Sequence, residues 1–538
     1  SNKKRGDLLM KEYILKNKIN LILSVLFGIF EVYFIYLFTI NSSRLVNIFV
    51  GKEATSPNDI VIRALVYVVT ACFCFYVSEK NSNAFTKNIC TDLRHDYIDG
   101  LFLSKTSSFY KKNKGDFLAD VDQNVDQLRL DYLSTLPNAL TGIGRSIVYI
   151  VGLYMIHPYI LLSTLLFVVL PGLVSSKFSK YISKLQVSRS KKYSTYIDIL
   201  NELLDGYLLI KQSNNREYFL HNFDKNNENL LEARNKLNIT NSMLYEILFV
   251  LNLISYLLII YIGSILVKNN LIELSDLLAS LTLVSISTNA MAEAFRDLTK
   301  ILSTREIKDM VVGNIPSKTK NLKIEKIPML DIEIRDLSFS YGDNNIFKNL
   351  DLNIEENKSY AIIGKSGSGK STLGKILIKI NDDYLGEISF KNGDFKSFRE
   401  NEIYSLIYYI PQNSIVFRDS LVKNIAMGDR DIDLEKIEEI IKKVDLDYVY
   451  QRKKDTILGN DSLSGGEKKK LELARALYRK AQVIIFDEPT SGLDPISAST
   501  IEKLIRQLDE ITRIVITHNH DEDYLKTFDK IVNIENYK

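Results

Sequence analysis

Long runs of apolar residues alternate with long polar stretches in the first half of the chain. A bilayer core about 30 Å thick requires roughly 20 mostly apolar residues in a helix. Leu, Ile, Val and Phe lie on all faces of the predicted helices, whereas a surface helix of a soluble protein keeps a polar face. We therefore predict membrane spans, rather than buried helices of a soluble protein, over six runs: 19–40, 60–77, 136–156, 159–174, 244–267 and 271–291.

The spacing of these runs predicts loops of unequal length. Short segments join spans one and two, three and four, and five and six, and His157-Pro158 is the shortest of them. Two long polar stretches, 78–135 and 175–243, separate the other pairs and keep repeated apolar positions. We expect these stretches to be helices that continue out of the membrane, because such positions are typical of packed helices.

Basic residues predict which side of the membrane these extensions occupy. The N-terminal flank carries Lys3, Lys4, Arg5, Lys11, Lys16 and Lys18, whereas the short loops on the other side carry only Arg44, Lys52 and Lys268. Because Lys and Arg accumulate on the cytosolic side, we place the N-terminus and both extensions there. An even number of spans returns the chain to the same side.

Glu31 and Arg145 lie within predicted spans. Charge inside a membrane is costly and faces a cavity or a partner. These residues therefore belong either to a substrate passage or to an internal ion pair, unless their side chains reach the interface.

The overall composition adds few limits. Net charge is +3, from 69 basic and 66 acidic residues, which gives no reason to expect a nucleic-acid partner. The three cysteines show neither metal-ligand spacing nor a disulfide framework. No removable signal peptide is evident at the N-terminus. The abundance of Lys, Asn and Ile suggests a bacterium with a low GC content.

After the sixth run the pattern changes. A helix is predicted over 293–312, and strand-like alternation begins with Ile332-Glu333-Ile334 and resumes at Leu337-Ser338-Phe339. We predict an α-helical transmembrane domain over 1–312, a linker over 313–330, and an α/β domain over 331–538.

A glycine-rich segment lies between the apolar strand 360–363 and an amphipathic helix predicted over 372–380. Glycines let the backbone curl so that successive N–H groups point at phosphate oxygens, and the helix N-terminus adds its positive end. Lys370 is placed to reach the β- and γ-phosphates, and the hydroxyl of Ser371 to hold Mg²⁺. The α/β domain is therefore predicted to be a P-loop nucleotide-binding domain. We predict an ATP site formed by Gly364, Lys365, Ser366, Gly367, Ser368, Gly369, Lys370, Ser371 and Thr372.

An acidic pair follows the apolar segment 483–486. Ligands of α/β sheets bind at strand ends, so Asp487 is a candidate Mg²⁺ ligand. Glu488 is a candidate general base that polarises the attacking water. A helix-capping role would explain such a pair in isolation, but a phosphate loop in the same domain favours catalysis.

The segment Leu463-Ser464-Gly465-Gly466-Glu467 lies between these two motifs. With it, the chain resembles the ATP-binding cassette (ABC) superfamily over essentially its whole length. The resemblance implies that Ser464, Gly465, Gly466 and Glu467 close on the nucleotide held by a partner. It also implies an adenine-stacking Tyr341, a Gln412 that senses the γ-phosphate and Mg²⁺, an Asp494 in the loop at the dimer interface, and a His518 that contacts the γ-phosphate.

The order of spans followed by one ATPase domain resembles an exporter-type half-transporter. That resemblance implies a dimer, by default a homodimer, although a heterodimer with a related chain stays open. It also implies a multi-pass protein of the cytoplasmic membrane that works by alternating access. Segments 108–118 and 206–219 resemble the two coupling regions of the family.

The sequence departs from the family pattern at two places. Glu467 stands where the family usually has Gln, and the stretch 456–462 is shorter than usual and lacks its usual Glu. These departures concern the contact between ATPase domain and membrane domain rather than the ATPase itself.

Several functions remain open at this stage. Export of a peptide, lipid or amphipathic small molecule is the first, and import on an exporter-type scaffold, as in metal–chelate uptake, is the alternative. A soluble ATPase of the same superfamily would lack the spans. No Cys/His protease domain precedes the first span, so cleavage of leader peptides by this chain is not expected. The transported substrate is not predicted.

Overall fold

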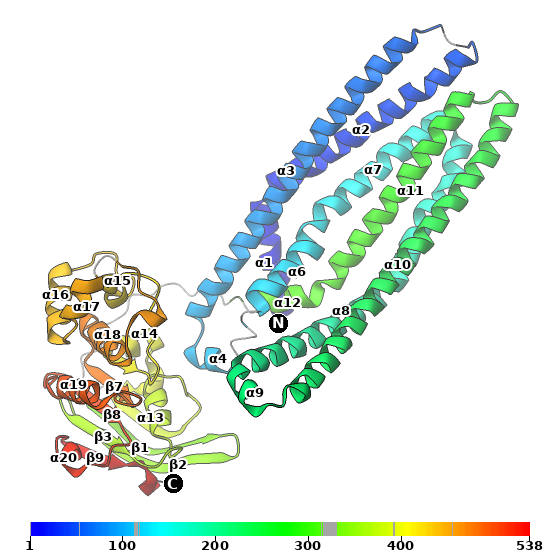
Figure 1. Ribbon diagram of the computed structural model, residues 1–538. Helices are drawn as coiled ribbons and strands as arrows, with labels where there is room; N and C mark the ends of the chain where they lie inside the picture. The colour runs from blue at the N-terminus through cyan, green and yellow to red at the C-terminus, as the bar shows by residue number, and fades with distance from the viewer. Residues whose placement is uncertain are drawn as a thin grey trace. The chain divides into compact units, whose positions relative to one another are not determined.

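The computed structural model describes residues 2–52, 54–111, 117, 119–313, 315, 331–390, 393–453 and 456–537. They fall into two compact units, one made of Ser1–Leu103 and Asn113–Lys318 and the other of Ser104–Lys112 and Thr319–Lys538 (Figure 1). Most of the predicted linker, 314 and 316–330, lies outside the described residues. The predicted domain boundaries therefore stay a prediction.

The first unit is entirely helical in its described part. Its elements are α1 (Asn2–Lys16), α2 (Lys18–Phe49), α3 (Pro57–Leu103), the π-helical turns η1 (Ala119–Asn124) and η2 (Arg129–Leu133) on either side of α6 (Val125–Leu128), α7 (Thr135–Ile156), α8 (Pro158–Asp205), α9 (Tyr207–Ser213), α10 (Arg216–Lys268), α11 (Leu274–Ser303) and α12 (Arg305–Gly313). Both long polar stretches continue spans as helices, as predicted, since α3, α8 and α10 each run well past an apolar segment.

Five described helices are long and apolar enough to cross a membrane: Lys18–Phe49, Pro57–Leu103, Asp120–Ile156, Arg216–Lys268 and Leu274–Leu302. The predicted fourth span, 159–174, is the N-terminal part of α8, and its assignment as a sixth span stays a prediction. Pro158 begins this helix and His157 caps it, since the His157 Nδ1 accepts a hydrogen bond from the Tyr159 N–H at 3.3 Å.

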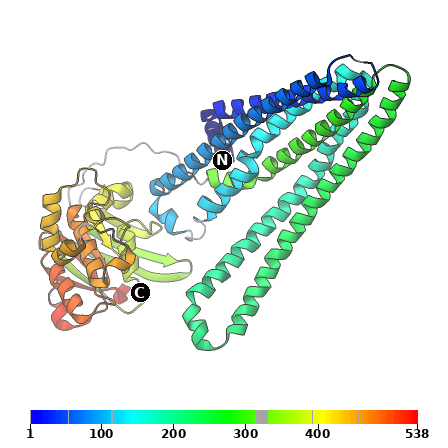
Figure 2. The same cartoon turned by 45° about the horizontal axis from the view of Figure 1, so that its top comes forward.

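The long helices pack as neighbouring pairs. α2 packs on α3, α7 on α11, and α8 on α10. In the turned view of Figure 2, α8 and α10 are the two long green helices that meet at one end, where α9 joins them. Their seam buries Ile182, Leu237, Leu244 and Leu248. Because this seam continues from the apolar segment into the polar one, it holds the extensions together as a helical hairpin.

The helix predicted over 293–312 is two helices in the structure, and the prediction of a single one was wrong. α11 ends at Ser303 and α12 begins at Arg305. The intervening Thr304 is fully buried, and its hydroxyl donates to the Ile301 carbonyl at 2.8 Å. A Thr hydroxyl bonded to the backbone competes with the helical ladder, which favours a break at this position.

The second unit contains two sheets. The antiparallel sheet has the order β2-β1-β4-β5, from β1 (Ile332–Tyr341), β2 (Asn344–Ile354), β4 (Leu385–Phe390) and β5 (Gly393–Asp394). The parallel sheet has the order β6-β7-β8-β3-β9, from β3 (Ser359–Ile363), β6 (Ile407–Ile410), β7 (Val483–Asp487), β8 (Thr512–Ile516) and β9 (Lys530–Asn533).

Helices cover the parallel sheet. The unit includes α4 (Thr106–Tyr110), α13 (Lys370–Leu377), α14 (Glu400–Leu406), α15 (Leu421–Ala426), α16 (Leu434–Lys443), α17 (Asp447–Lys453), α18 (Gly465–Tyr478), α19 (Pro495–Arg506) and α20 (Glu522–Leu525). Short 3-10 turns lie at Phe395–Ser397 (η3), Asn460–Ser462 (η4) and Ile534–Tyr537 (η5). Every residue of β7 and β8 is buried, as expected for central strands of a covered parallel sheet.

The two strand-like segments predicted near residue 335 form one continuous strand, β1. Its pairing with β2 shifts register between Ile334 and Leu337. Asp336, between them, has a left-handed backbone (φ 50°), and its N–H is held by Asp351 Oδ1 at 2.8 Å. The bulge absorbs one residue, so the apolar side chains on both sides of it reach the same core.

Candidate functional site

The glycine-rich loop connects β3 to the N-terminus of α13, as the sequence predicts. Gly364 and Gly369 have φ values of 150° and 99°, a region that favours glycine. A Cβ on Gly364 would meet Ser368 Oγ at 2.7 Å, and one on Gly369 would meet Ile346 Cγ2 at 2.3 Å. The Ser368 hydroxyl is fully buried and has no hydrogen-bond partner among the described residues. The loop is therefore a tight cradle with a free donor inside it.

Lys370 is the first residue of α13 and is buried. Its Nζ donates to the carbonyls of Gly364 at 2.7 Å and Lys365 at 2.9 Å, and lies 3.5 Å from His518 Nδ1. Burial lowers the pKa of Lys370, although Glu488 and Asp487 favour its charged form. The loop thus holds the Lys370 ammonium group against its own carbonyl oxygens. An anionic phosphate bound in the loop would stabilise this buried charge.

Asp487, at the end of β7, accepts two hydrogen bonds. Ser371 Oγ donates to its Oδ1 at 2.8 Å, and the hydroxyl of Tyr409 on the neighbouring strand β6 donates to its Oδ2. Burial, and then the bond to Asp487, raise the pKa of the Tyr409 hydroxyl, which keeps it a donor. A hydroxyl beside a carboxylate is the oxygen donor set that Mg²⁺ prefers.

Glu488 connects two further predicted residues. Gln412 Nε2 donates to Glu488 Oε2 at 2.8 Å, and His518 Nε2 lies 2.9 Å from Glu488 Oε1. The backbone of Glu488 is left-handed (φ 49°), which is strained for a non-glycine residue and held here by its N–H bond to the Ile516 carbonyl at 3.0 Å. The structure thus brings Lys370, Ser371, Gln412, Asp487, Glu488 and His518 into one connected group, hereafter the phosphate-site cluster.

The signature segment forms the start of α18. Ser464 is the N-cap, its Oγ accepts from the Glu467 N–H at 3.3 Å, and Glu467 Oε2 accepts from the Ser464 N–H at 2.7 Å. This reciprocal pair is a capping box, in which Glu and Gln serve equally. The departure from Gln to Glu at position 467 therefore keeps the local structure.

Two predicted residues lie apart from the phosphate-site cluster. Tyr341 ends β1, is half exposed, and its hydroxyl accepts from Asn381 Nδ2 at 2.8 Å. Asp494 is the N-cap of α19, and its Oδ1 accepts from the N–H groups of Ile496 and Ser497 at 3.1 and 3.0 Å. Within the described residues no hydrogen bond joins Tyr341, Asp494 or the signature segment to that cluster.

Two residues of the site were missed by sequence reasoning. Tyr409 is one, and Lys469 is the other. Lys469 is buried on α18, and its Nζ donates to the carbonyls of Pro411 and Gln412 at 2.7 and 2.8 Å. Burial lowers the pKa of Lys469. Its position two residues after the signature was the available signal. However, Lys469 lies in a run of three lysines, and such a run is usually exposed to solvent. Through Lys469, the signature helix fixes the backbone that carries Gln412.

The first predicted coupling region, 108–118, overlaps the end of α4, and α4 belongs to the second unit, where residues just before the predicted region make most of its contacts. The Thr106 N–H donates to both oxygens of Glu400 at 3.1 and 3.0 Å, and its hydroxyl donates to Glu400 Oε2 at 2.9 Å. Ser107 Oγ donates to Asp382 Oδ2 at 3.1 Å, and Lys111 Nζ to Asp383 Oδ2 at 2.9 Å. Residues 112–116 and 118 of this region lie outside the described part of the chain. The second predicted region, 206–219, contains α9.

Glu31 and Arg145 form an ion pair between α2 and α7, with Arg145 Nη2 3.1 Å from Glu31 Oε2. The internal ion pair, one of the interpretations given above, is present in the structure. Arg145 also lines a polar cavity of about 320 Å³ with Asn138, Glu293, Arg296 and Asp297.

The fold and site together define a membrane-embedded ATPase, with apolar helices in one unit and a phosphate-binding loop in the other. The ABC transporter transmembrane region family matches residues 19–291, and the ABC transporter family matches residues 347–491. The chain belongs to the ABC transporter family and therefore binds ATP and couples its hydrolysis to transport. The fold class predicted from the sequence is confirmed.

Relatives of known description extend over most of the chain. A protein of Rickettsia felis described as an export ATP-binding/permease protein is 25% identical over 88% of this chain and 84% of its own length. A lactococcin-A transport/processing ATP-binding protein of Lactococcus lactis is 26% identical over 81% of this chain and 62% of its own length. An ATP-dependent lipid A-core flippase of Saccharophagus degradans is 26% identical over 86% and 79%.

Proposed function

We propose that this chain is one half of an exporter that moves a peptide, lipid or amphipathic small molecule across the cytoplasmic membrane of a bacterium. One observation carries the proposal: the phosphate-site cluster occurs in the same chain as five helices long enough to span a membrane. The printed descriptions of relatives name export, lactococcin transport and a lipid A-core flippase, which supports outward movement of amphipathic cargo.

The sixth span of the proposal is the start of α8. Tyr159, Leu162, Val169 and Leu173 are each more than half exposed in the isolated chain. Apolar side chains that face outward on a long apolar helix are expected to face lipid tails. This exposure supports a span over 159–174.

The proposed nucleotide site assigns one task to each residue of the phosphate-site cluster. The loop 364–372, with Lys370, holds the ATP phosphates. Ser371, Asp487 and Gln412 hold Mg²⁺, which neutralises phosphate charge when bound. The fit rests on the buried unpartnered Ser368 hydroxyl and on the hydroxyl–carboxylate pair of Ser371 and Asp487.

Glu488 is the proposed general base. It would accept a proton from the attacking water, and its two partners, Gln412 and His518, would orient its carboxylate during that step. His518 also lies next to Lys370, so it is placed to contact the terminal phosphate. The strained backbone at Glu488 supports a functional role, since strain of this kind clusters at active sites.

The remaining predicted residues support a dimer. Ser464, Gly465 and Gly466 begin α18 and present a helix N-terminus, which attracts anions. Within the described residues, no member of the phosphate-site cluster bonds to them. A second subunit would bring its nucleotide to this helix start, while Tyr341 would stack on adenine and Asp494 would lie at the interface. A homodimer is the default, and a heterodimer with a related chain is the alternative.

Transport in inside-out vesicles tests the direction of movement. The full-length protein is reconstituted, and ATP-dependent accumulation of peptides, lipids and dyes is measured for wild type and Glu488→Gln. Accumulation inside the inverted vesicles by wild type alone supports export. Depletion of a metal–chelate from the lumen would instead support the importer alternative.

A further inference from the structure

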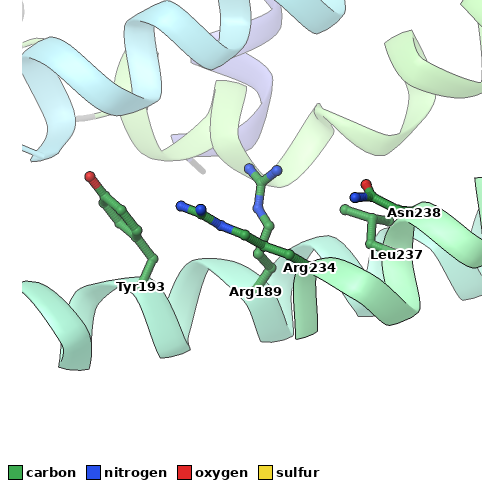
Figure 3. Close-up of a pocket in the computed structure, with 5 residues that line it drawn as sticks. All are labelled: Arg189, Tyr193, Arg234, Leu237 and Asn238. Carbon is green, nitrogen blue, oxygen red and sulfur yellow. The ribbon is translucent and has the colours of Figure 1, made fainter. Parts of the chain in front are cut away.

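The helical hairpin of α8 and α10 carries a pocket lined by Arg189, Tyr193, Arg234, Leu237 and Asn238 (Figure 3). Its volume is about 360 Å³. Figure 3 shows all five side chains projecting to the same side of the two helices. No residue of this pocket belongs to the phosphate-site cluster or to a coupling region.

The spacing along each helix explains why these side chains converge. Arg189 and Tyr193 are four residues apart on α8, and Arg234 and Asn238 are four apart on α10, so each pair occupies one helix face. Leu237 is buried in the seam between the helices and supplies an apolar part of the pocket lining. The polar groups of the lining are two guanidinium groups, one phenol and one carboxamide.

The charge of this pocket is not balanced by direct contacts. Within the described residues, neither Arg189 nor Arg234 makes an ion pair or a hydrogen bond to a carboxylate. Asp131 on η2 interacts with Arg189 electrostatically, so one acidic group is near. Two guanidinium groups at one small site repel each other unless an anion lies between them. The pocket is therefore suited to an anion that brings several acceptor oxygens.

We propose that this pocket binds the phosphate head of an amphipathic cargo before the cargo enters the membrane region. A phosphate matches the donor set, because guanidinium forks bind its oxygens in pairs and the Tyr193 hydroxyl and Asn238 amide add single donors. Uncharged or cationic heads gain nothing from two arginines. The inference names a substrate class and rests on the proposed export function.

The position of the pocket favours a cargo over a lipid in the plane of the membrane. Arg189 and Arg234 lie roughly 15 to 22 Å beyond the predicted span ends at 174 and 244, at about 1.5 Å of helix per residue. The headgroup layer of one leaflet is only about 5–8 Å thick. A lipid headgroup at rest in its leaflet does not reach that far, whereas a molecule approaching from the cytosol does.

The chain contains no tryptophan, which allows a local test that the ATP site does not disturb. Tyr196→Trp places a single indole on α8, one turn from Tyr193. The full-length protein in phosphatidylcholine nanodiscs is titrated with dihexanoyl phosphatidic acid, dihexanoyl phosphatidylcholine and inorganic phosphate while tryptophan fluorescence is followed. Phosphate bound at the glycine-rich loop is remote from this indole in sequence and lies in the other unit.

Arg189→Gln and Arg234→Gln, each in the Tyr196→Trp background, test the site. Each is expected to weaken half-saturation by dihexanoyl phosphatidic acid about tenfold or more, because each removes charge-assisted bonds. The matched controls Lys191→Gln and Lys236→Gln remove the same charge two residues away, on other faces of the same helices, and are expected to leave binding unchanged.

The outcomes separate cleanly. Dihexanoyl phosphatidylcholine, whose phosphate is esterified twice, is expected to bind weakly. If inorganic phosphate binds as well as dihexanoyl phosphatidic acid, the pocket is an anion site for a soluble phosphate compound and not for an amphipathic cargo. No fluorescence change with any probe, or equal loss in the arginine and lysine variants, would overturn the inference. ATP hydrolysis measured on the same samples tests the proposed function separately, because it does not require this pocket.

Discussion

The Glu488 carboxylate lies in contact with the His518 imidazole, with 2.9 Å between Glu488 Oε1 and His518 Nε2, although 30 positions separate them in the chain. Their strands, β7 and β8, are neighbours in the parallel sheet, so the residues that follow each strand meet at one edge. Gln412, which follows β6 on the other side of β7, completes the arrangement by donating to the same carboxylate. Residues that follow three neighbouring strands, β6, β7 and β8, thus meet at the Glu488 carboxylate.

His518→Ala removes one of the two partners of this carboxylate. We expect ATP turnover to fall by about 10²–10⁴-fold, the usual contribution of a group that positions or relays a proton, with little loss of ATP binding. Steady-state ATPase rates and equilibrium binding of a fluorescent ATP analogue measure the two quantities. His520→Ala, an exposed histidine two residues away, is the control and should hydrolyse ATP normally. Equal rates in both variants would remove His518 from the site.

Tyr409→Phe deletes the hydroxyl that holds Asp487 from the neighbouring strand. Second-shell bonds of this kind typically contribute 10- to 100-fold to metal affinity, so about that increase in the Mg²⁺ concentration for half-maximal ATPase activity is expected. High Mg²⁺ should restore much of the rate, which a misfolded variant would not show.

Tyr408→Phe is the matched control for that experiment. Tyr408 is adjacent on the same strand, and its hydroxyl donates to Glu472 rather than to Asp487. Its Mg²⁺ dependence is expected to match the wild type. A shift of the same size in both variants would show that the strand, and not the bond to Asp487, sets the Mg²⁺ requirement.

Glu400→Ala removes the acceptor of three hydrogen bonds from Thr106 at the start of α4. We expect basal ATPase activity to persist and stimulation by transported cargo to fall several-fold, because the segment that follows α3 loses its main anchor on the ATPase unit. Asp383→Ala is the control on the same surface. It removes the ion pair between Asp383 and Lys111, whose side chains are both more than half exposed. Exposed ion pairs contribute little to stability, so cargo should stimulate the ATPase activity of this variant as it does in the wild type. Identical stimulation in both variants would contradict the role of Glu400.

The parts of the fold that follow from short or strongly periodic patterns were predictable. The apolar runs and the phosphate loop depend on contiguous residues, and fold class was confirmed from them. The break at Thr304 and the bulge at Asp336 were not predicted, since each depends on one residue whose local bonding the pattern does not encode. Residues 314 and 316–330, which are most of the predicted linker 313–330, lie outside the described part.

Site residues were predictable where they belong to a contiguous motif with recognisable flanking strands or helices. The structure connects six of the predicted residues, and their roles remain predictions. Tyr409, Lys469 and Glu400 were missed because their partners lie 57 to 294 positions away in the chain. Arg189 and Arg234 were missed for the same reason, because only the packing of α8 on α10 brings the two arginines to one pocket.

The central claim is that two copies of this chain share their nucleotide sites and that Glu488 drives hydrolysis. The most direct measurement compares wild type and Glu488→Gln, full length in nanodiscs, for ATP turnover and for the stoichiometry of ATP retained after rapid removal of free nucleotide. We predict nearly abolished turnover and two ATP molecules retained per dimer in the variant. Normal turnover by Glu488→Gln, or tight ATP retention by single separated chains, would contradict the account.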